Sequence, residues 1–370
     1  MTEWKEYKLG EIVSIASGFA YKGEYIGKGE NLLLGMGCVS YKEKFLLSGA
    51  RPYAGDCAER YYAKVGDIVL ATRQQSDNLP ILGMPAIIPE DLKDKKLIIG
   101  ANLYRVTNNS DFDNKYIYWL LKTPDYVRYI ASCKTGTTVA MITKSDIENF
   151  AFVAPDKSGR ERILKIMDSL DDKIDLLHRE NKTLEAMAET LFRQWFIEEA
   201  KEDWEEGKLG DLIEIKYGKD HKKLEDGKIP VIGSGGIMRY ANTSLYDKES
   251  VLIPRKGSLN NVMYINKPFW TVDTMFYTKM LKPNTAKFVY HFMKGLDLAN
   301  MNVGSAVPSM TTEVLNNIPI DIPPQDVFDK FENHVGNLYR KMEDNNKQIQ
   351  TLIQQRDGLL PKLMSGEVKI

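Results

Sequence analysis

The sequence predicts an α+β protein in which two similar domains are separated by two long helices that form an antiparallel coiled coil. Three observations support this prediction: a long amphipathic helical pattern in the middle of the chain, the same pattern at its C-terminal end, and a collinear internal repeat with pseudo-twofold character. A chain of 370 residues suits two or three domains. We expect a first domain at 1–157, a helix at 158–202, a second domain at 203–324 and a second helix at 325–370.

The central helix is the clearest element. Its apolar positions step by three and four residues from Ile163 to Trp195, so they form one seam, and Asn181 is the one polar residue on it. No proline or glycine occurs in residues 160–201, which predicts a helix of about 38 residues and roughly 57 Å. The charged positions between the seam residues, Asp171 among them, are expected to face solvent. A pattern of this length favours a coiled coil over a core helix of one large domain.

The C-terminal helix repeats this pattern. A shift of 165 residues aligns positions 328–360 with the seam and places Asn346 on Asn181, although Glu332 and Arg356 replace apolar residues. If the helices pair antiparallel, their midpoints meet near the two asparagines. We therefore expect Asn181 and Asn346 to contact each other and to select one register. The alternative is that both lie at the exposed edge of the seam.

The domains repeat as well. The segment around Trp4 returns around Trp204, and Gly18 matches Gly218. Further matches follow in the same order, with an offset that falls from 200 to 168 residues as the second copy loses loop residues; they join Leu33–Gly37 to Val231–Gly235, Asp67–Leu70 to Glu249–Leu252, Lys115–Lys122 to Lys287–Lys294, and Gly136–Val139 to Gly304–Val307. The collinear order indicates a duplicated module.

Short apolar runs bounded by glycine, proline or asparagine predict strands within each module. Examples are residues 12–16, 67–71, 97–106, 250–254 and 270–280. One helix is predicted late in each copy, at about 113–132 and 284–299. Because strands do not alternate with helices, we expect mostly antiparallel pairing.

Composition and motifs exclude several classes of function. No apolar run approaches 18 residues and the N-terminus lacks a signal-peptide core, so we expect a cytoplasmic protein without a membrane partner. The three cysteines and four histidines have neither paired nor metal-ligand spacing, which predicts no metal site. The run Gly233–Gly236 resembles a phosphate-binding loop but lacks a following helix and a P-loop lysine, so a turn is favoured. No catalytic constellation is present, and the chain is predicted to be a binder.

The net charge of −1 is unevenly distributed. Residues 156–206 contain nine Lys/Arg against fifteen Asp/Glu, so the rest of the chain carries +5. This excess permits contact with nucleic-acid phosphates without demonstrating it.

Polar side chains recur at equivalent places in both copies and form three pairs of loops. Arginine reads guanine and Gln or Asn reads adenine in the major groove, whereas Lys and Ser hold phosphates, so DNA contact is the functional interpretation. Solvated loops without a ligand are the alternative. We expect Arg73 and Arg255 to lie on the same side as the loops of Gly136 and Gly304. The candidate DNA-binding residues are Tyr21, Lys22, Arg73, Gln74, Gln75, Ser76, Asn78, Lys134, Thr137, Lys219, Lys222, Lys223, Arg255, Lys256, Ser258, Asn260, Asn261, Asn302 and Ser305.

Four segments together resemble the specificity subunit of type I restriction-modification enzymes, over essentially the whole chain. They are Leu191–Phe196 and Arg356–Glu367 at the ends of the two helices, and Gly18–Tyr21 and Pro230–Gly236 in the domains. The resemblance implies two target-recognition domains, each reading one half of a split site in double-stranded DNA. It supplies no individual base contacts, because recognition loops vary with the target.

The resemblance also implies partners. The helices are expected to dock two modification subunits, which bind S-adenosylmethionine and methylate adenine, and restriction subunits that depend on ATP and Mg²⁺ join that core. No cofactor is expected in this chain. The rival interpretation is a structural adaptor whose paired modules bind proteins on a coiled-coil rod, and a lone DNA methyltransferase is disfavoured by the missing cofactor loop.

Apolar residues beside the seam at the helix ends are candidates for partner docking. They are Phe192, Phe196, Leu359 and Leu363. The alternative is that these side chains pack internally against the domains.

Overall fold

The computed structural model describes residues 3–41, 43–74, 81–136, 139–301 and 309–368. The chain divides into two compact units: unit 1 comprises residues 1–176 and 348–370, and unit 2 comprises residues 177–347. Each unit holds one globular module together with a stretch of both long helices, α5 (Lys157–Arg193) and α8 (Gln325–Ser365). A π-helical turn, Gln194–Glu198, continues α5. Our division of the chain into four segments stays a prediction.

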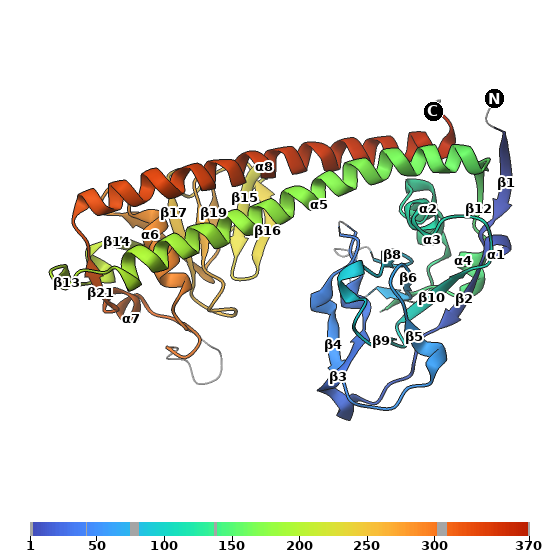
Figure 1. Ribbon diagram of the computed structural model, residues 1–370, viewed down its shortest axis with the longest axis horizontal. Coiled ribbons are helices and arrows are strands. Elements are labelled where there is room, and N and C mark those ends of the chain that lie inside the picture. The colour runs from blue at the N-terminus through green and yellow to red at the C-terminus, as the bar shows by residue number, and fades with distance from the viewer. Residues whose placement is uncertain (1–2, 42, 75–80, 137–138, 302–308, 369–370) are drawn as a thin grey trace. The chain divides into compact units, whose positions relative to one another are not determined.

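Module 1, the part of unit 1 outside α5 and α8, is built mainly from antiparallel strands (Figure 1). Its first sheet contains, in spatial order, β2 (Val13–Ser17), β10 (Leu103–Asn108), β6 (Ile68–Ala71) and β8 (Pro85–Ile87). Its second sheet contains β4 (Ala50–Tyr53), β3 (Ile26–Leu34), β9 (Leu97–Ile99) and β5 (Tyr62–Ala63), of which β3 and β9 are parallel. Two further pairs are β1 (Trp4–Lys8) with β12 (Ala151–Pro155), and β7 (Arg73–Gln74) with β11 (Ala140–Met141). The helices are α1 (Leu9–Ile12), α2 (Asn114–Leu120), α3 (Pro124–Cys133) and α4 (Lys144–Glu148).

Module 2, the corresponding part of unit 2, has the same strand order in its first sheet and one strand fewer in its second. Its first sheet contains, in spatial order, β14 (Ile213–Tyr217), β20 (Met275–Met280), β17 (Ser250–Pro254) and β18 (Met263–Ile265). Its second sheet contains β16 (Gly236–Ala241), β15 (Asp226–Gly233) and β19 (Trp270–Thr271), of which β15 and β19 are parallel. The remaining elements are the pair β13 (Glu205–Lys208) with β21 (Pro319–Ile322), and the helices α6 (Ala286–Lys294) and α7 (Thr312–Asn316). The predicted α+β repeat is thus confirmed.

Two matched glycines mark the point where the chain passes from the first sheet to the second. Gly18 follows β2 and Gly218 follows β14, and a Cβ atom would lie 2.2 Å from the carbonyl oxygen of Gly100 and 2.0 Å from that of Val272, respectively. Atoms cannot approach so closely, so both positions require glycine. The same backbone crossing therefore occurs in both modules, at the two glycines that the repeat aligns.

Three predicted elements are divided in the structure. The run 97–106 forms β9 and β10, and the run 270–280 forms β19 and β20, because each chain leaves one sheet and enters the other. The predicted helix at 113–132 is broken between α2 and α3. Pro124 lacks the N–H that an uninterrupted helix needs, but it suits the first turn of α3, where the Thr123 hydroxyl accepts from Tyr126 N.

The two long helices pack antiparallel in each unit (Figure 1). In unit 1, Ile163 of α5 shares an apolar core with Leu360 of α8. In unit 2, Asn181 of α5 meets Asn346 of α8, whereas Phe192, later in α5, meets Phe331, earlier in α8. The predicted seam therefore buries its apolar residues between the helices and against the modules.

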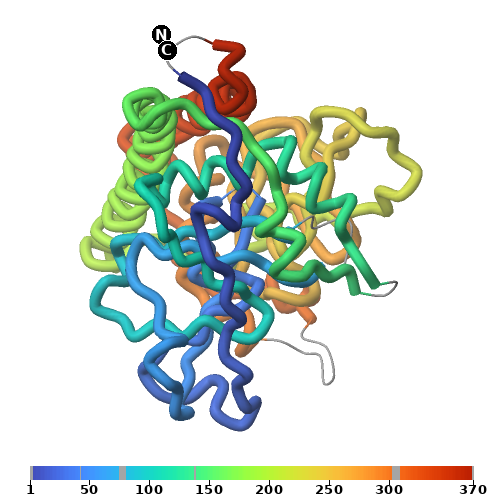
Figure 2. Tube along the Cα trace, turned by 90° about the vertical axis from the view of Figure 1, so that its right-hand side faces the viewer, coloured from blue at the N-terminus to red at the C-terminus, as the bar shows by residue number. Residues whose placement is uncertain are grey.

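The ends of the described chain meet in unit 1 (Figure 2). The ring of Trp4 in β1 lies against Gly366, which directly follows α8, and β1 pairs with β12, which precedes α5. The first strand is thus held both by the strand that leads into α5 and by the residue that ends α8.

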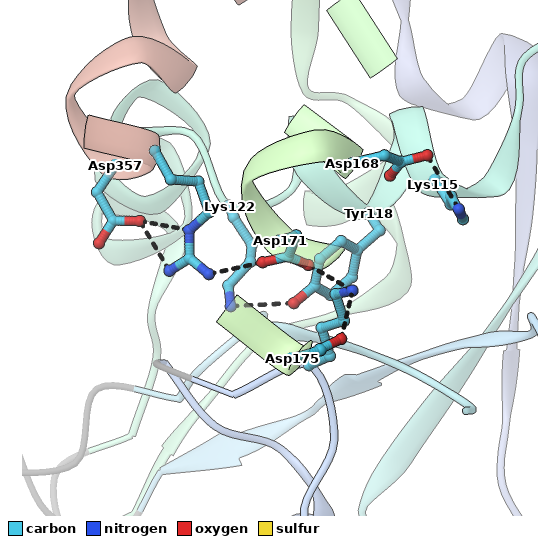
Figure 3. Close-up of polar contacts among 9 residues, drawn as sticks. Lys115, Tyr118, Lys122, Asp168, Asp171, Asp175 and Asp357 are labelled. Atoms are coloured by element: carbon cyan, nitrogen blue, oxygen red, sulfur yellow. Dashed lines mark hydrogen bonds and ion pairs between the residues drawn. The ribbon is translucent and has the colours of Figure 1, made fainter. Parts of the chain in front are cut away.

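Asp171 corrects one prediction, because it is 2% exposed rather than facing solvent. Its Oδ1 accepts from Nη1 of Arg356 in α8 at 2.9 Å, and Nζ of Lys44 from module 1 lies 2.5 Å from its Oδ2. Figure 3 shows Asp171 contacted from two sides and Asp357 on the far side of the same guanidinium group. Periodicity could not reveal that α8 covers this position with a cation. Arg356 occupies an apolar place in the repeat because Asp171 neutralises it.

A second charged seam residue is explained in the same way in unit 2. Glu332 of α8 accepts from Nζ of Lys287 at 2.7 Å, and this buried lysine also contacts Glu249 at 2.9 Å. Its repeat partner in unit 1, Lys115, contacts Asp168 of α5 at 2.9 Å (Figure 3). In both units, therefore, a lysine near the start of the repeated helix fastens the module to a long helix.

Three asparagines lie where α5 and α8 meet in unit 2. Nδ2 of Asn181 donates to Oδ1 of Asn346 at 3.0 Å, so the predicted contact is confirmed. The buried amide, however, is Asn345, which is 1% exposed and donates to Asn181 at 2.9 Å and to Glu180 at 3.0 Å. Asn346 is exposed, as the exposed-edge alternative described. The role of these residues in register stays a prediction.

We predict that Asp171→Ala lowers the free energy of unfolding by about 3 kcal/mol, because the buried Arg356 loses its buried partner and keeps only the mostly exposed Asp357. Asp175→Ala is the matched control; this aspartate also contacts Lys44, at 3.4 Å, but it is mostly exposed, so a loss below about 0.5 kcal/mol is expected. Urea unfolding followed by circular dichroism measures both. The double change Asp171→Leu with Arg356→Leu should recover most of the loss, and equal small effects of the two single changes would show that the ion pair is not buried.

We also predict that Asn345→Ala costs about 1–3 kcal/mol of unfolding free energy, since it leaves Asn181 and Glu180 without a donor at a covered position. Asn346→Ala removes a hydrogen bond that water can replace and should cost less than about 1 kcal/mol. Thermal and urea unfolding of the two variants test this order. The reverse order would mean that Asn345 is not the amide that matters at this crossing.

Candidate nucleic-acid interface

The loop edge of unit 1 is formed by Arg73, Gln74 and Lys134–Gly136. After β6, the backbone N and the hydroxyl of Thr72 both donate to the carbonyl of Asn102, at 3.1 and 3.0 Å, which turns the chain toward β11. Arg73 then pairs with Met141, and Met141 also bridges to Thr135. The expectation that Arg73 lies on the same side as the loop of Gly136 is therefore confirmed.

The charge of Arg73 is exposed beside Tyr104 of β10. Burial raises the pKa of the Tyr104 hydroxyl and the carboxylate of Asp146 raises it further, while the positive charge of Arg73 opposes both effects. The Tyr104 hydroxyl donates to the carbonyl of Ile142 at 3.2 Å. This edge thus presents a solvated guanidinium group on a backbone held by two strands.

The loop edge of unit 2 is formed by Tyr217, Lys219 and Arg255–Ser258. The Arg255 backbone N donates to Thr274 at 2.8 Å and its carbonyl accepts from Met310 at 2.9 Å, while Lys256 bridges to Ser309. Residues 302–308, including Gly304, lie outside the described residues, but the segment that follows them pairs with Arg255 and Lys256 as the corresponding segment does in unit 1.

The side chain of Arg255 is held in a defined plane. Nη1 donates to the carbonyl of Asp273 at 3.1 Å, and the guanidinium carbon lies 5.3 Å from the centre of the Tyr217 ring. Such stacking orients the planar guanidinium group without consuming all of its five N–H donors. Arg255 is half-buried, whereas Lys256 and Ser258 are exposed. The arrangement can present the free N–H groups of Arg255 to a paired acceptor.

A third region adds positive charge near the start of each module. In unit 1, Tyr21 packs edge-on against Tyr53 and Lys22 is exposed. In unit 2, Lys219, Lys222 and Lys223 are exposed, and the carbonyl of Lys219 accepts from the indole N–H of Trp270 at 2.9 Å. Lysines on this loop therefore point their ammonium groups into solvent from an anchored backbone.

Several candidate residues have internal partners. Gln74 Oε1 accepts from Leu82 N at 3.3 Å, Asn261 donates to the carbonyl of Ser234 at 2.8 Å, and Asn260 bonds to Asp297 and to the backbone N of Ala299. These amides shape their loops, and base contact by them stays a prediction. The candidates that lie outside the described residues are Gln75, Ser76, Asn78, Thr137, Asn302 and Ser305.

The expected docking residues belong to the apolar cores of their own units. The ring of Phe192 packs against Phe288 and Phe331, and Phe196 lies against the same two rings. Leu363 is buried in the core of unit 1 and Leu359 packs against that core. Phe192 and Leu363 are buried, as the internal-packing alternative stated, whereas Phe196 and Leu359 are partly buried, and docking by these residues stays a prediction.

Sequence reasoning missed Tyr217 and the exposed side chains of β16. Tyr217 is exposed and supports Arg255, and its position directly before the matched Gly218 was the signal that could have found it. The Gly233–Gly236 run forms the tight turn between β15 and β16, as predicted.

Within the described residues no group of three or more His, Cys, Asp or Glu side chains is placed to hold a metal ion. Among the same residues, no helix combines the length and apolar character needed to cross a bilayer.

The family model for the type I restriction modification DNA specificity domain matches residues 1–186 and again residues 201–350. The chain belongs to this family. It is 22% identical to the type I restriction enzyme MjaIX specificity subunit of Methanocaldococcus jannaschii, over all of this chain and 94% of the relative. It is 21% identical to the HindI specificity subunit of Haemophilus influenzae, over the full length of both chains.

The fold agrees with a solved member of the family. The type I restriction-modification S subunit from M. genitalium superposes with a TM-score of 0.56 at 19% identity, over 98% of this chain and 96% of that chain. The duplicated match places one family domain on each module and the long helix that follows it. The resemblance noted from the sequence is confirmed.

Proposed function

We propose that this chain reads a bipartite site in double-stranded DNA as the specificity subunit of a type I restriction-modification complex, with one half-site read by each module. The observation that carries the proposal is the loop edge: each of the two similar modules presents an arginine just beyond an equivalent strand, β6 or β17, with different residues around it. Because the two arginines occupy equivalent positions, both modules can contact DNA in the same way. The different neighbours, Gln74 against Lys256, give them different targets.

Arginine suits this task because its planar group can donate two parallel hydrogen bonds to guanine O6 and N7. The surrounding lysines, Lys219, Lys222 and Lys223 in unit 2, suit phosphate contact, which provides affinity and orientation but little specificity. The loop edges lack a catalytic constellation in the described residues, so the modules supply recognition and partner subunits supply chemistry.

The complex is proposed to contain two modification subunits, docked on the long helices, and restriction subunits that join them. S-adenosylmethionine, ATP and Mg²⁺ would then be bound by those partners. Since Phe192 and Leu363 are buried, docking would also use the polar outer faces of α5 and α8. An adaptor that binds only proteins is the rival function, and it does not account for the matched arginines.

The test is a gel-shift and selection experiment with the chain and its modification subunit on random-sequence duplexes, at about 50 and about 200 mM salt. We expect one bipartite sequence to be enriched and to survive the higher salt, because base contacts persist when phosphate contacts are screened. Enrichment of no sequence, in an assembled complex, would leave the adaptor function as the better account.

We predict that Arg73→Ala and Arg255→Ala each weaken binding by about 1–3 kcal/mol and relax one half-site only. Each variant is the control for the other half-site, which should keep its sequence preference. Selection on randomised half-sites measures both effects.

The lysine variants Arg73→Lys and Arg255→Lys separate base reading from phosphate contact. Lysine retains the positive charge but cannot donate two parallel hydrogen bonds. If the arginine reads a base, the lysine variant should therefore have the same relaxed selectivity at its half-site as the alanine variant. Recovery of wild-type selectivity with lysine would show that the arginine holds a phosphate.

A further inference from the structure

The hairpin tip of unit 2, residues 234–238, comprises the turn after β15 and the first residues of β16, and it exposes apolar side chains. Ile237 and Met238 are 55% and 59% exposed, and Gly233 pairs with Gly236 to close the turn. Figure 1 shows β15 and β16 of this hairpin. The next apolar residue on β16, Tyr240, is also exposed. Three exposed apolar side chains close together on one strand are a candidate contact surface.

The hairpin tip is attached to the loop edge of the same unit. The amide of Asn261 donates to the carbonyl of Ser234 at 2.8 Å, and a Cβ atom on Gly257 would lie 2.9 Å from the Ser234 hydroxyl oxygen. The segment from Arg255 to Asn261 thus runs against the turn. Whatever contacts Arg255 and Lys256 is brought close to Ile237 and Met238.

We propose that the hairpin tip is a second reading element of unit 2, in which Ile237 and Met238 contact thymine methyl groups in the major groove. This inference rests on the proposed function. A two-stranded ribbon fits the major groove, and the 5-methyl group of thymine is the apolar group that base pairs present there. An apolar side chain against any other base edge would desolvate donors and acceptors without replacing their hydrogen bonds. The hairpin tip therefore selects A·T pairs next to the bases read by Arg255.

DNA is favoured over a protein partner by the surroundings of the hairpin tip. Exposed Lys256 lies on the loop edge that the hairpin tip contacts, and the backbone of exposed Lys219 bonds to Thr271, which pairs with Ile232 near the turn. Lys222 and Lys223 lie before β15, at the other end of the hairpin. This charge is complementary to phosphates. The apolar patch is continuous with the Arg255 segment rather than with the long helices, where modification subunits are proposed to dock.

Among its described residues, unit 1 has no tight hairpin at the corresponding place, although Tyr41 and Leu47 in its connection are also exposed, at 54% and 55%. Its corresponding strands, β3 and β4, are joined by the longer connection 35–49, and Lys44 within that connection is committed to Asp171 of α5. Reading by a hairpin tip is therefore confined to the half-site of unit 2. Asymmetry between the half-sites becomes a prediction specific to this inference.

The experiment uses the chain assembled with its modification subunit and the bipartite duplex enriched from random DNA. Each thymine of that duplex is replaced by deoxyuridine, which removes the methyl group and leaves base pairing intact. We expect the replacement to weaken binding roughly fourfold for each methyl group contacted, in one half-site only. Ile237→Ser and Met238→Ser should weaken binding to the thymine duplex and should abolish the difference between thymine and uracil.

Leu281→Ser is the matched control, because Leu281 is 57% exposed and lies at the opposite end of β20 from the loop edge. It should keep the full difference between thymine and uracil. Circular dichroism of the three serine variants confirms that these surface substitutions leave the fold intact.

Three outcomes would overturn the inference while leaving the proposed function in place. They are a sequence-selective complex that binds uracil and thymine duplexes equally, a uracil effect that persists in both hairpin variants, and hairpin variants that fail to assemble with the modification subunit. The last outcome would make the hairpin tip a protein interface. Failure of the wild-type complex to select any sequence would instead reject the proposed function.

Discussion

The position of each module depends on the pairing of α5 with α8, because buried charges fasten the modules to these helices. In unit 1, Lys44 reaches the Asp171–Arg356 pair, and in unit 2, Lys287 reaches Glu332. A charge removed from water is stable only beside its partner, so such contacts permit one placement of the module along the helix. Each loop edge is part of its module. Their location therefore follows from ion pairs that lie far from them in sequence.

Helix α6 shows how one module element can contact both long helices at once. Glu185 of α5 accepts from the Tyr290 hydroxyl at 3.0 Å and from Lys294 at 2.6 Å. On the other side, Nε2 of His291 lies 2.9 Å from the hydroxyl of Tyr339 in α8. Burial and the charge of Lys294 lower the pKa of His291 to about 4, so its ring is neutral at physiological pH and adds no repulsion beside that lysine. The helix thus joins both partners without an unpaired charge.

The sequence predicted what repeats, and it failed where distant segments meet. Periodicity located the seam and the contact of Asn181 with Asn346, and the collinear matches, Gly18 with Gly218 among them, located the duplicated module. Periodicity placed Asp171 in solvent because a helical pattern carries no information on the cation that covers this residue. It also assigned Phe192 to partner docking, although an apolar residue beside the seam can equally well pack against a module. The support of Arg255 by Tyr217 was invisible for the same reason, since the two residues lie on strands that are distant in sequence.

The connection after β3 in unit 1 and the equivalent connection after β15 in unit 2 have different physical roles. The connection after β3 in unit 1 is long enough to carry Lys44 to Asp171, so it contributes to the attachment of the module. The connection after β15 in unit 2 is a tight turn, and module 2 is attached through Lys287, the repeat partner of Lys115 in module 1. Because attachment in unit 2 does not require this turn, its residues are free to present Ile237 and Met238 beside Arg255. A difference in how two equivalent modules are held thereby allows a difference in what they read.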